Sequence, residues 1–257
     1  MTTATELGTR LTYDIEGEGT PVVLLHGLTF DRTTWRPITE RLGDGVQTIA
    51  VDLPGHGASP GPAVTLDELV VRIHELLASL DIDEPVVVGH SIGASLAFFY
   101  AGRFPARGVV GVDQPLDVRA FSALLKQIEP VLRGPGFASA FERFQESMEI
   151  DRIPEPLRSL VYDAQRIEQD VVVGYWEEVL RSDTDALQAR IDDGLASIEI
   201  PALAVFGRTM PEGSEHGLAR VHDLELEEWP GLGHFPHLVD ADRFTARLRA
   251  FIDRVAI

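Results

Sequence analysis

The chain has 257 residues, of which 41 are acidic and 22 basic, so its formal net charge at pH 7 is −19. This charge disfavours nucleic acids and acidic membrane surfaces as partners, because both repel a polyanion. The chain contains no cysteine, which excludes disulfides, thiolate catalysis and zinc sites with cysteine ligands. The composition is ordinary for a globular protein, and it says nothing about the oligomeric state.

The N-terminal segment lacks a basic stretch followed by an apolar run, so we expect no signal peptide and a cytoplasmic location. The longest apolar stretch, residues 86–102, is interrupted by His90, Ser91 and Ser95. It is too short and too polar for a membrane span.

Short apolar runs mark the predicted strands in chain order. We expect an edge strand over residues 11–16, and buried strands over 22–26, 48–51, 86–88, 109–112 and 203–206. A weaker strand, interrupted by glutamates, is expected over 224–229. Continuous apolar runs of this kind are typical of parallel strands that are buried on both faces.

Helical patterns lie between these strands. Thr65 precedes Glu68 by three residues, a capping-box spacing, and apolar residues follow at helical period up to Leu80. Further helices are expected over 92–104 and 241–255. Strands that alternate with helices predict an α/β fold, with a mostly parallel sheet covered by helices on both faces.

Residues 117–197 break this alternation, because they contain no convincing buried strand. They predict short helices split by Pro130, Pro135, Pro154 and Pro156, and the run 171–173 is ambiguous between helix and strand. We predict a core domain of residues 1–116 and 198–257, with 117–197 inserted as a helical cap. Such a cap excludes water and shapes a pocket.

A candidate nucleophile lies between a predicted strand and a predicted helix. Residues 89–93, Gly-His-Ser-Ile-Gly, form a G-x-S-x-G motif in the strand-to-helix context that this motif requires. The sharp turn needs residues without side chains at 89 and 93, and it would expose the Ser91 hydroxyl above the sheet. We therefore predict Ser91 as a nucleophile. The alternative is a tight turn in which the serine has no chemical part.

Four motifs occur in an order that resembles the α/β-hydrolase family over nearly the whole chain. They are residues 25–28 (LHGL), 52–57 (DLPGHG), 89–93 (GHSIG) and 231–236 (GLGHFP). The resemblance implies the α/β-hydrolase fold and a catalytic triad.

The resemblance also implies roles for single residues. It places the general base at His234, with His237 as the rival three residues on. An oxyanion hole would form from the backbone N–H groups of Ile92, directly after the nucleophile, and Leu28. We expect His26 to brace its loop rather than to take part in catalysis.

The acid of the triad is where this chain departs from the family. The family usually carries an aspartate at the position occupied here by Met210, which cannot orient an imidazole. Asp113, at the end of the predicted strand 109–112, is our preferred substitute. Haloalkane dehalogenases and zearalenone-type lactonases take their acid from this strand end. Glu212 and Glu215 are alternatives, and so is the absence of any acid.

The predicted function is a serine esterase or lactonase for a fairly apolar small molecule, without cofactor or metal. Residues 113–115 and 207–211 are locally similar to the lactonase branch. We expect Phe30, Tyr175 and Trp176 in the pocket wall, and no obvious basic clamp for a carboxylate or phosphate.

Two other classes stay open. Cofactor-independent ring-cleaving dioxygenases also have a histidine before the elbow serine and an acid at the middle strand end, and they would consume oxygen without an acyl-enzyme. A non-catalytic small-molecule binder is kept open by Met210, although intact Ser91, Gly93 and His234 argue against it. Dehalogenase or epoxide hydrolase activity is disfavoured because the elbow carries serine rather than aspartate.

Overall fold

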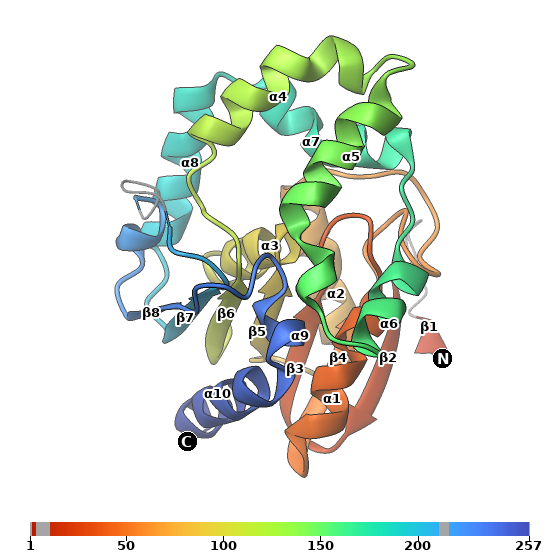
Figure 1. Cartoon of the computed structure of the whole chain (residues 1–257). Helices are drawn as coiled ribbons and strands as arrows, with labels where there is room; N and C mark the ends of the chain where they lie inside the picture. Colours follow the sequence, from red (N-terminus) through yellow and green to blue (C-terminus); the bar gives the residue numbers. More distant parts are fainter. Residues whose placement is uncertain (1, 4–10, 211–215, 257) are drawn as a thin grey trace.

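The computed structural model describes residues 2–3, 11–210 and 216–256. Within these ranges one sheet holds eight strands in the order β1-β2-β4-β3-β5-β6-β7-β8 (Figure 1). The strands are β1 (Thr2–Thr3), β2 (Thr12–Gly17), β3 (Gly19–Leu25), β4 (Gly45–Val51), β5 (Val86–His90), β6 (Gly108–Val112), β7 (Ala202–Phe206) and β8 (Leu224–Glu228). β1 pairs antiparallel with β2 and β2 with β4, whereas all other neighbouring strands run parallel.

The sheet confirms the predicted α/β fold. Each predicted strand is present, with ends that differ by up to three residues. One expectation is wrong: the strand placed at the edge, β2, is flanked by the short β1. A two-residue strand carries too little pattern to be recognised in a sequence.

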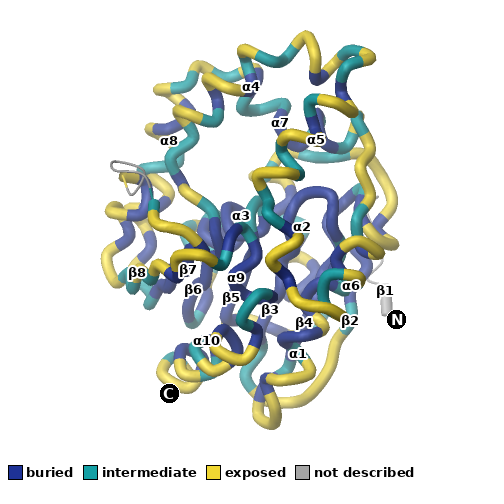
Figure 2. The backbone as a smooth tube through the Cα atoms, in the orientation of Figure 1, coloured by how far each residue is buried: buried dark blue, intermediate teal, exposed yellow. Residues whose placement is uncertain are grey.

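Side chains from the two faces of the sheet enter two separate cores. Val22, Leu24, Val86 and Val88 contribute to one cluster. Their neighbours in sequence, such as Val23, contribute to the other. This alternation follows from the two-residue period of a strand. It explains why the central strands are apolar at nearly every position, and Figure 2 shows them as the most buried part of the molecule.

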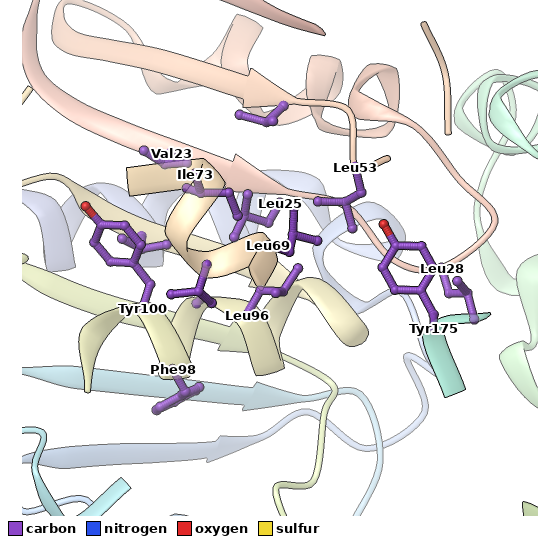
Figure 3. Close-up of a cluster of buried hydrophobic side chains, with 14 of the residues drawn as sticks. Val23, Leu25, Leu28, Leu53, Leu69, Ile73, Leu96, Phe98, Tyr100 and Tyr175 are labelled. Atoms are coloured by element: carbon purple, nitrogen blue, oxygen red, sulfur yellow. The ribbon is translucent and has the colours of Figure 1, made fainter. Parts of the chain in front are cut away.

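Helices cover both faces of the sheet. One core contains side chains of α1 (Arg36–Leu42) and α10 (Ala241–Val255), and the other contains side chains of α2 (Leu66–Ser79) and α3 (Ile92–Ala101). Figure 3 shows Leu69 and Ile73 of α2 beside Leu96 of α3. The short helices η1 (Arg32–Trp35), η3 (Leu218–Arg220) and α9 (Pro236–Val239) lie in the connections.

The predicted helix starts and ends are close to those observed. The Thr65 hydroxyl accepts the N–H of Glu68 at 3.2 Å, which caps α2 as the sequence predicts. α3 ends at Ala101 rather than at residue 104. α1, a helix of seven residues, was not predicted from the sequence.

The segment between β6 and β7 forms the expected helical insertion. It contains α4 (Arg119–Leu132), α5 (Phe137–Met148), η2 (Ile150–Arg152), α6 (Leu157–Ala164), α7 (Gln169–Arg181) and α8 (Thr184–Ala196). Figure 1 shows α4, α5, α7 and α8 as an arch over one edge of the sheet. The domain boundaries at residues 116/117 and 197/198 stay a prediction.

Two details of this insertion differ from the sequence analysis. Pro130 lies inside α4, two residues before its end, and so does not split the segment as expected. A proline this close to a helix end removes one backbone hydrogen bond but leaves almost no helix beyond it to disrupt. The ambiguous run 171–173 is helical and belongs to α7.

No helix in the described part of the chain is long and apolar enough to cross a membrane.

Candidate active site

Ser91 stands at the junction of β5 and α3 in a strained backbone conformation, with φ 54° and ψ −125°. The junction is as tight as the motif predicts. A β-carbon on Gly89 would lie 1.9 Å from the Gly93 carbonyl oxygen, and one on Gly93 would lie 2.3 Å from the Leu25 carbonyl oxygen. Neither position can therefore hold a side chain without a backbone shift.

The predicted oxyanion donors lie on either side of this serine. Ile92 is the first residue of α3, where backbone N–H groups have no acceptor within the helix. Leu28 follows β3 on a loop that packs against the elbow, since a β-carbon on Gly27 would lie 3.3 Å from Cβ of Ser91. Ser91, Ile92 and Leu28 line the same cavity.

Two buried histidines support the loop that carries Leu28. His26 donates from Nδ1 to the Gly27 carbonyl at 2.8 Å and accepts the Leu53 N–H on Nε2 at 3.0 Å. His56 accepts the Thr29 N–H on Nε2, also at 3.0 Å. Burial lowers the pKa of His26 to about 4 and that of His56 to about 3. Both rings are thus neutral near pH 7, and His26 has the bracing position that the sequence analysis expects.

Asp113 and His234 come together at the carboxyl end of β6. The Asp113 Oδ2 accepts a hydrogen bond from His234 Nδ1 at 2.7 Å, and its Oδ1 accepts the Gly207 N–H at 3.0 Å. The carboxylate is 6% exposed. Burial opposes its ionisation, but the hydrogen bonds from His234 and Gly207 and the nearby Arg208 outweigh that effect and hold the pKa of Asp113 below its usual value.

The imidazole of His234 lines the same cavity as Ser91. Among the described residues, no hydrogen bond is formed by the Ser91 hydroxyl. Such contacts are often long in unliganded sites and shorten when substrate binds. The loop of His234 is held against the elbow by His90, whose Nε2 donates to the His234 backbone carbonyl at 2.8 Å.

The rival base and the other candidate acids occupy different places. His237 is 1% exposed, packs against Trp35 with ring centroids 4.9 Å apart, and is not among the described residues that line the cavity. Met210 lines the cavity and donates its N–H to Glu228 at 2.8 Å. Glu212 and Glu215 lie outside the described residues.

The cavity has a volume of about 690 Å³, in the range of small-molecule sites. Phe30, Tyr175 and Trp176, the predicted wall residues, all line it. The Tyr175 hydroxyl donates to the Pro54 carbonyl at 2.9 Å, and burial raises the pKa of this phenol. Tyr175 therefore offers its ring rather than an acidic proton.

The cavity is less uniformly apolar than the sequence suggests, because Arg103, Arg190 and Arg208 also line it. Arg208 directly follows β7 and Gly207, and its guanidinium lies 3.9 Å from Asp113. Three arginines from distant segments give no signal in the sequence, since only the fold brings them to one cavity. Within the described ranges, no group of three or more histidine, aspartate or glutamate side chains is arranged to hold a metal ion.

Comparisons with known proteins agree with this architecture. The model of the Alpha/beta hydrolase family matches residues 22–247. A non-heme haloperoxidase of Rhodococcus erythropolis is 26% identical, over 96% of this chain and 97% of its own.

Two solved structures show the same fold. The enol-lactonase from Burkholderia xenovorans LB400 superposes with a TM-score of 0.79 at 20% identity, over 98% of this chain and 100% of that one. A thermophilic esterase from Thermogutta terrifontis has a TM-score of 0.75 at 23% identity, over 97% and 95% of the two chains.

Proposed function

Since the chain belongs to the alpha/beta hydrolase family, we propose that it is a serine hydrolase that cleaves a carboxylic ester or lactone of a fairly apolar small molecule. The observation that carries this proposal is the 2.7 Å hydrogen bond between Asp113 and His234, in a cavity that Ser91 also lines. A carboxylate that accepts a hydrogen bond from Nδ1 leaves Nε2 of the imidazole free to act as the base.

In the first half-reaction, Ser91 Oγ attacks the carbonyl carbon and its proton passes to Nε2 of His234. Asp113 stabilises the imidazolium that forms. The N–H groups of Leu28 and Ile92 donate to the oxyanion of the tetrahedral intermediate. The bond from the carbonyl carbon to the leaving oxygen then breaks, and His234 gives its proton to that oxygen.

In the second half-reaction, water attacks the acyl-enzyme and gives a proton to His234. The bond to Ser91 Oγ breaks, the serine regains its proton, and a carboxylic acid leaves. The balance is one ester and one water consumed, with one acid and one alcohol formed. A lactone gives a single hydroxy acid.

The hydrogen bond between Asp113 and His234 weakens the case for a non-catalytic binder, which rested on Met210 at the usual position of the acid. Met210 occupies the position usual for the acid, but His234 has its carboxylate partner in Asp113, from the neighbouring strand end. The dioxygenase alternative shares the same residues, so it must be separated by experiment.

The test is labelling with a fluorophosphonate, read by intact mass. We expect one adduct on the unsubstituted protein and none on Ser91→Ala. Asp113→Asn should lower the labelling rate by about 1,000-fold or more, as loss of a triad aspartate does. Asp83→Asn, an exposed aspartate before β5, is the matched control and should label normally.

Other outcomes contradict parts of the proposal. Labelling that is unaffected by Asp113→Asn would move the acid to Glu212 or Glu215. Failure to label the unsubstituted protein would overturn the hydrolase proposal. Substrate-dependent oxygen consumption would then indicate a dioxygenase, and ligand binding without turnover a binder.

A further inference from the structure

The cavity at Ser91 extends along the whole length of α3. Ser91, Ser95, Phe99 and Gly102 all line it. Their spacing of four, four and three residues places them on one face of the helix. At 1.5 Å per residue, Gly102 lies about 16 Å from Ser91 along the helix axis. The site is therefore elongated, with the serine at one end of α3.

Apolar side chains from the cap complete this part of the cavity, which we call the α3 branch. They are Phe121 of α4, Val179 of α7, and Leu187 and Ile191 of α8. The branch is thus an apolar passage between α3 and three cap helices. Ser95, at 8% exposure, is a small polar residue in its floor.

Charged side chains border the distant end of the α3 branch. Asp67, Arg103, Glu178 and Arg190 line the cavity. Arg103 directly follows Gly102 and donates to the Asp67 backbone carbonyl at 3.5 Å, and Arg190 forms an ion pair with Glu178. Asp67, Arg103 and Arg190 are exposed to solvent. Burial of apolar surface therefore stops at about the level of Gly102.

The position of the base decides which part of an ester would enter this branch. His234 must give its proton to the leaving oxygen, so the leaving group lies beside His234. Arg208, which also lines the cavity, lies 3.9 Å from Asp113, the hydrogen-bond partner of His234, and so borders the leaving-group side. The acyl portion is then the part that extends along α3.

We propose that the substrate carries an unbranched apolar acyl chain that lies in the α3 branch, and this inference rests on the proposed function. An extended alkyl chain advances about 1.25 Å per carbon, given C–C bonds of about 1.5 Å. A branch of about 16 Å accommodates about a dozen carbons at that spacing. A longer chain would reach the charged end of the branch, where further carbons would bury no more apolar surface.

The experiment measures kcat/KM for p-nitrophenyl esters from acetate to hexadecanoate. We expect a rise of about 200-fold from butanoate to octanoate, because each of the four added methylenes contributes about fourfold when it is buried. The increase should end near dodecanoate. A kcat/KM that is flat or falls from butanoate onward would overturn the proposal.

Ile191→Trp tests the location of the chain. Its indole would fill the branch, so the ratio of kcat/KM for dodecanoate to that for acetate should fall more than tenfold. Val179→Phe, from the adjacent helix, is a second variant in case the first fails to fold. Val131→Trp is the matched control, since Val131 is 44% exposed on α4 and its ratio should not change. Equal ratios in Ile191→Trp and Val131→Trp would place the chain elsewhere.

A binding measurement separates this inference from the proposed chemistry. Calorimetry with Ser91→Ala should show dodecanoic acid binding more tightly than butanoic acid, with the difference reduced in the double variant with Ile191→Trp. If no ester is hydrolysed but this chain-length dependence holds, the proposed function fails and the α3 branch stands. If Ser91-dependent hydrolysis occurs without any chain-length dependence, the proposed function stands and the proposal of an acyl chain in the α3 branch fails.

Discussion

At the residue scale, two members of the candidate triad have a positive φ, a backbone conformation that residues other than glycine rarely adopt. Ser91 has φ 54° and Asp113 has φ 47°, each at the carboxyl end of neighbouring strands. Such strain costs about 1–3 kcal/mol per residue and persists only where the surroundings enforce it. Here the Ser91 N–H donates to Val112 at 2.9 Å and the Asp113 N–H to Val205 at 2.8 Å, so each strained residue is tied to the next strand.

His90 is a positioning residue at the same scale. It precedes Ser91 and donates a hydrogen bond to the His234 backbone carbonyl. We expect His90→Phe to lower kcat about 100-fold, because a small misplacement of the catalytic base greatly slows the reaction. KM should change little, since the ring is buried. His90→Gln keeps an N–H donor and should recover part of the loss. Steady-state kinetics of both variants check this, and equal kcat in the two would exclude the hydrogen bond as the cause.

At the element scale, the β5–α3 junction depends on close backbone approach. Gly93 packs against the carbonyl oxygens at the end of β3, so the position of α3 is set by contacts that only glycine permits. Because the N-terminus of α3 supplies Ile92 to the oxyanion hole, this packing also sets the geometry of the site.

Replacement of two glycines tests this dependence. Gly93→Ala should lower the free energy of unfolding by about 3 kcal/mol or more, since the backbone must move to relieve the overlap. Gly194→Ala is the matched control, because Gly194 lies in α8 and an added β-carbon there meets nothing within 4 Å. Gly194→Ala should raise the free energy of unfolding by about 0.5–1 kcal/mol, because alanine has a higher helix propensity than glycine. Urea unfolding measures both, and similar effects at the two sites would refute the argument.

At the scale of the whole molecule, four histidines are buried as neutral rings. Burial lowers the pKa of His26 to about 4 and of His56 and His237 to about 3, and it lowers that of His90 well below the usual value. An unfolded chain binds protons at these positions below about pH 6.5, whereas the folded protein does not. Stability should therefore be full above pH 6.5 and be lost as the pH falls from there toward 4.

Each such histidine contributes a slope of about 1.4 kcal/mol per pH unit in that window. We expect urea unfolding between pH 7 and 4.5 to show this steep loss, and His237→Phe to reduce the slope by about one histidine's share. His237 suits the test because its buried Nδ1 has no hydrogen-bond partner in the described residues. His222→Phe, at an exposed position, is the matched control. An unchanged slope in His237→Phe would show that this histidine is protonated equally in both states.

Local patterns in the sequence were enough for most of the fold. The strand period of two, the helical period and the Thr65 cap each depend on residues close together in the chain, so the elements could be predicted. The elbow at Ser91 belongs to the same class, because five consecutive residues impose its geometry. The short β1 and α1 were missed because they carry too few residues to establish a period.

The tertiary structure alone decided how distant segments meet. Asp113 and His234 are 121 residues apart, and only strand order and loop packing bring their atoms to 2.7 Å. Both residues could be proposed from the sequence, but Glu212 and Glu215 stayed as alternatives. Sequence positions alone do not give the distance in space between each acidic side chain and His234. The α3 branch likewise depends on the fold, which brings side chains of α7 and α8 to the same cavity as α3. Contacts of this kind are set by packing between elements, which no local period encodes.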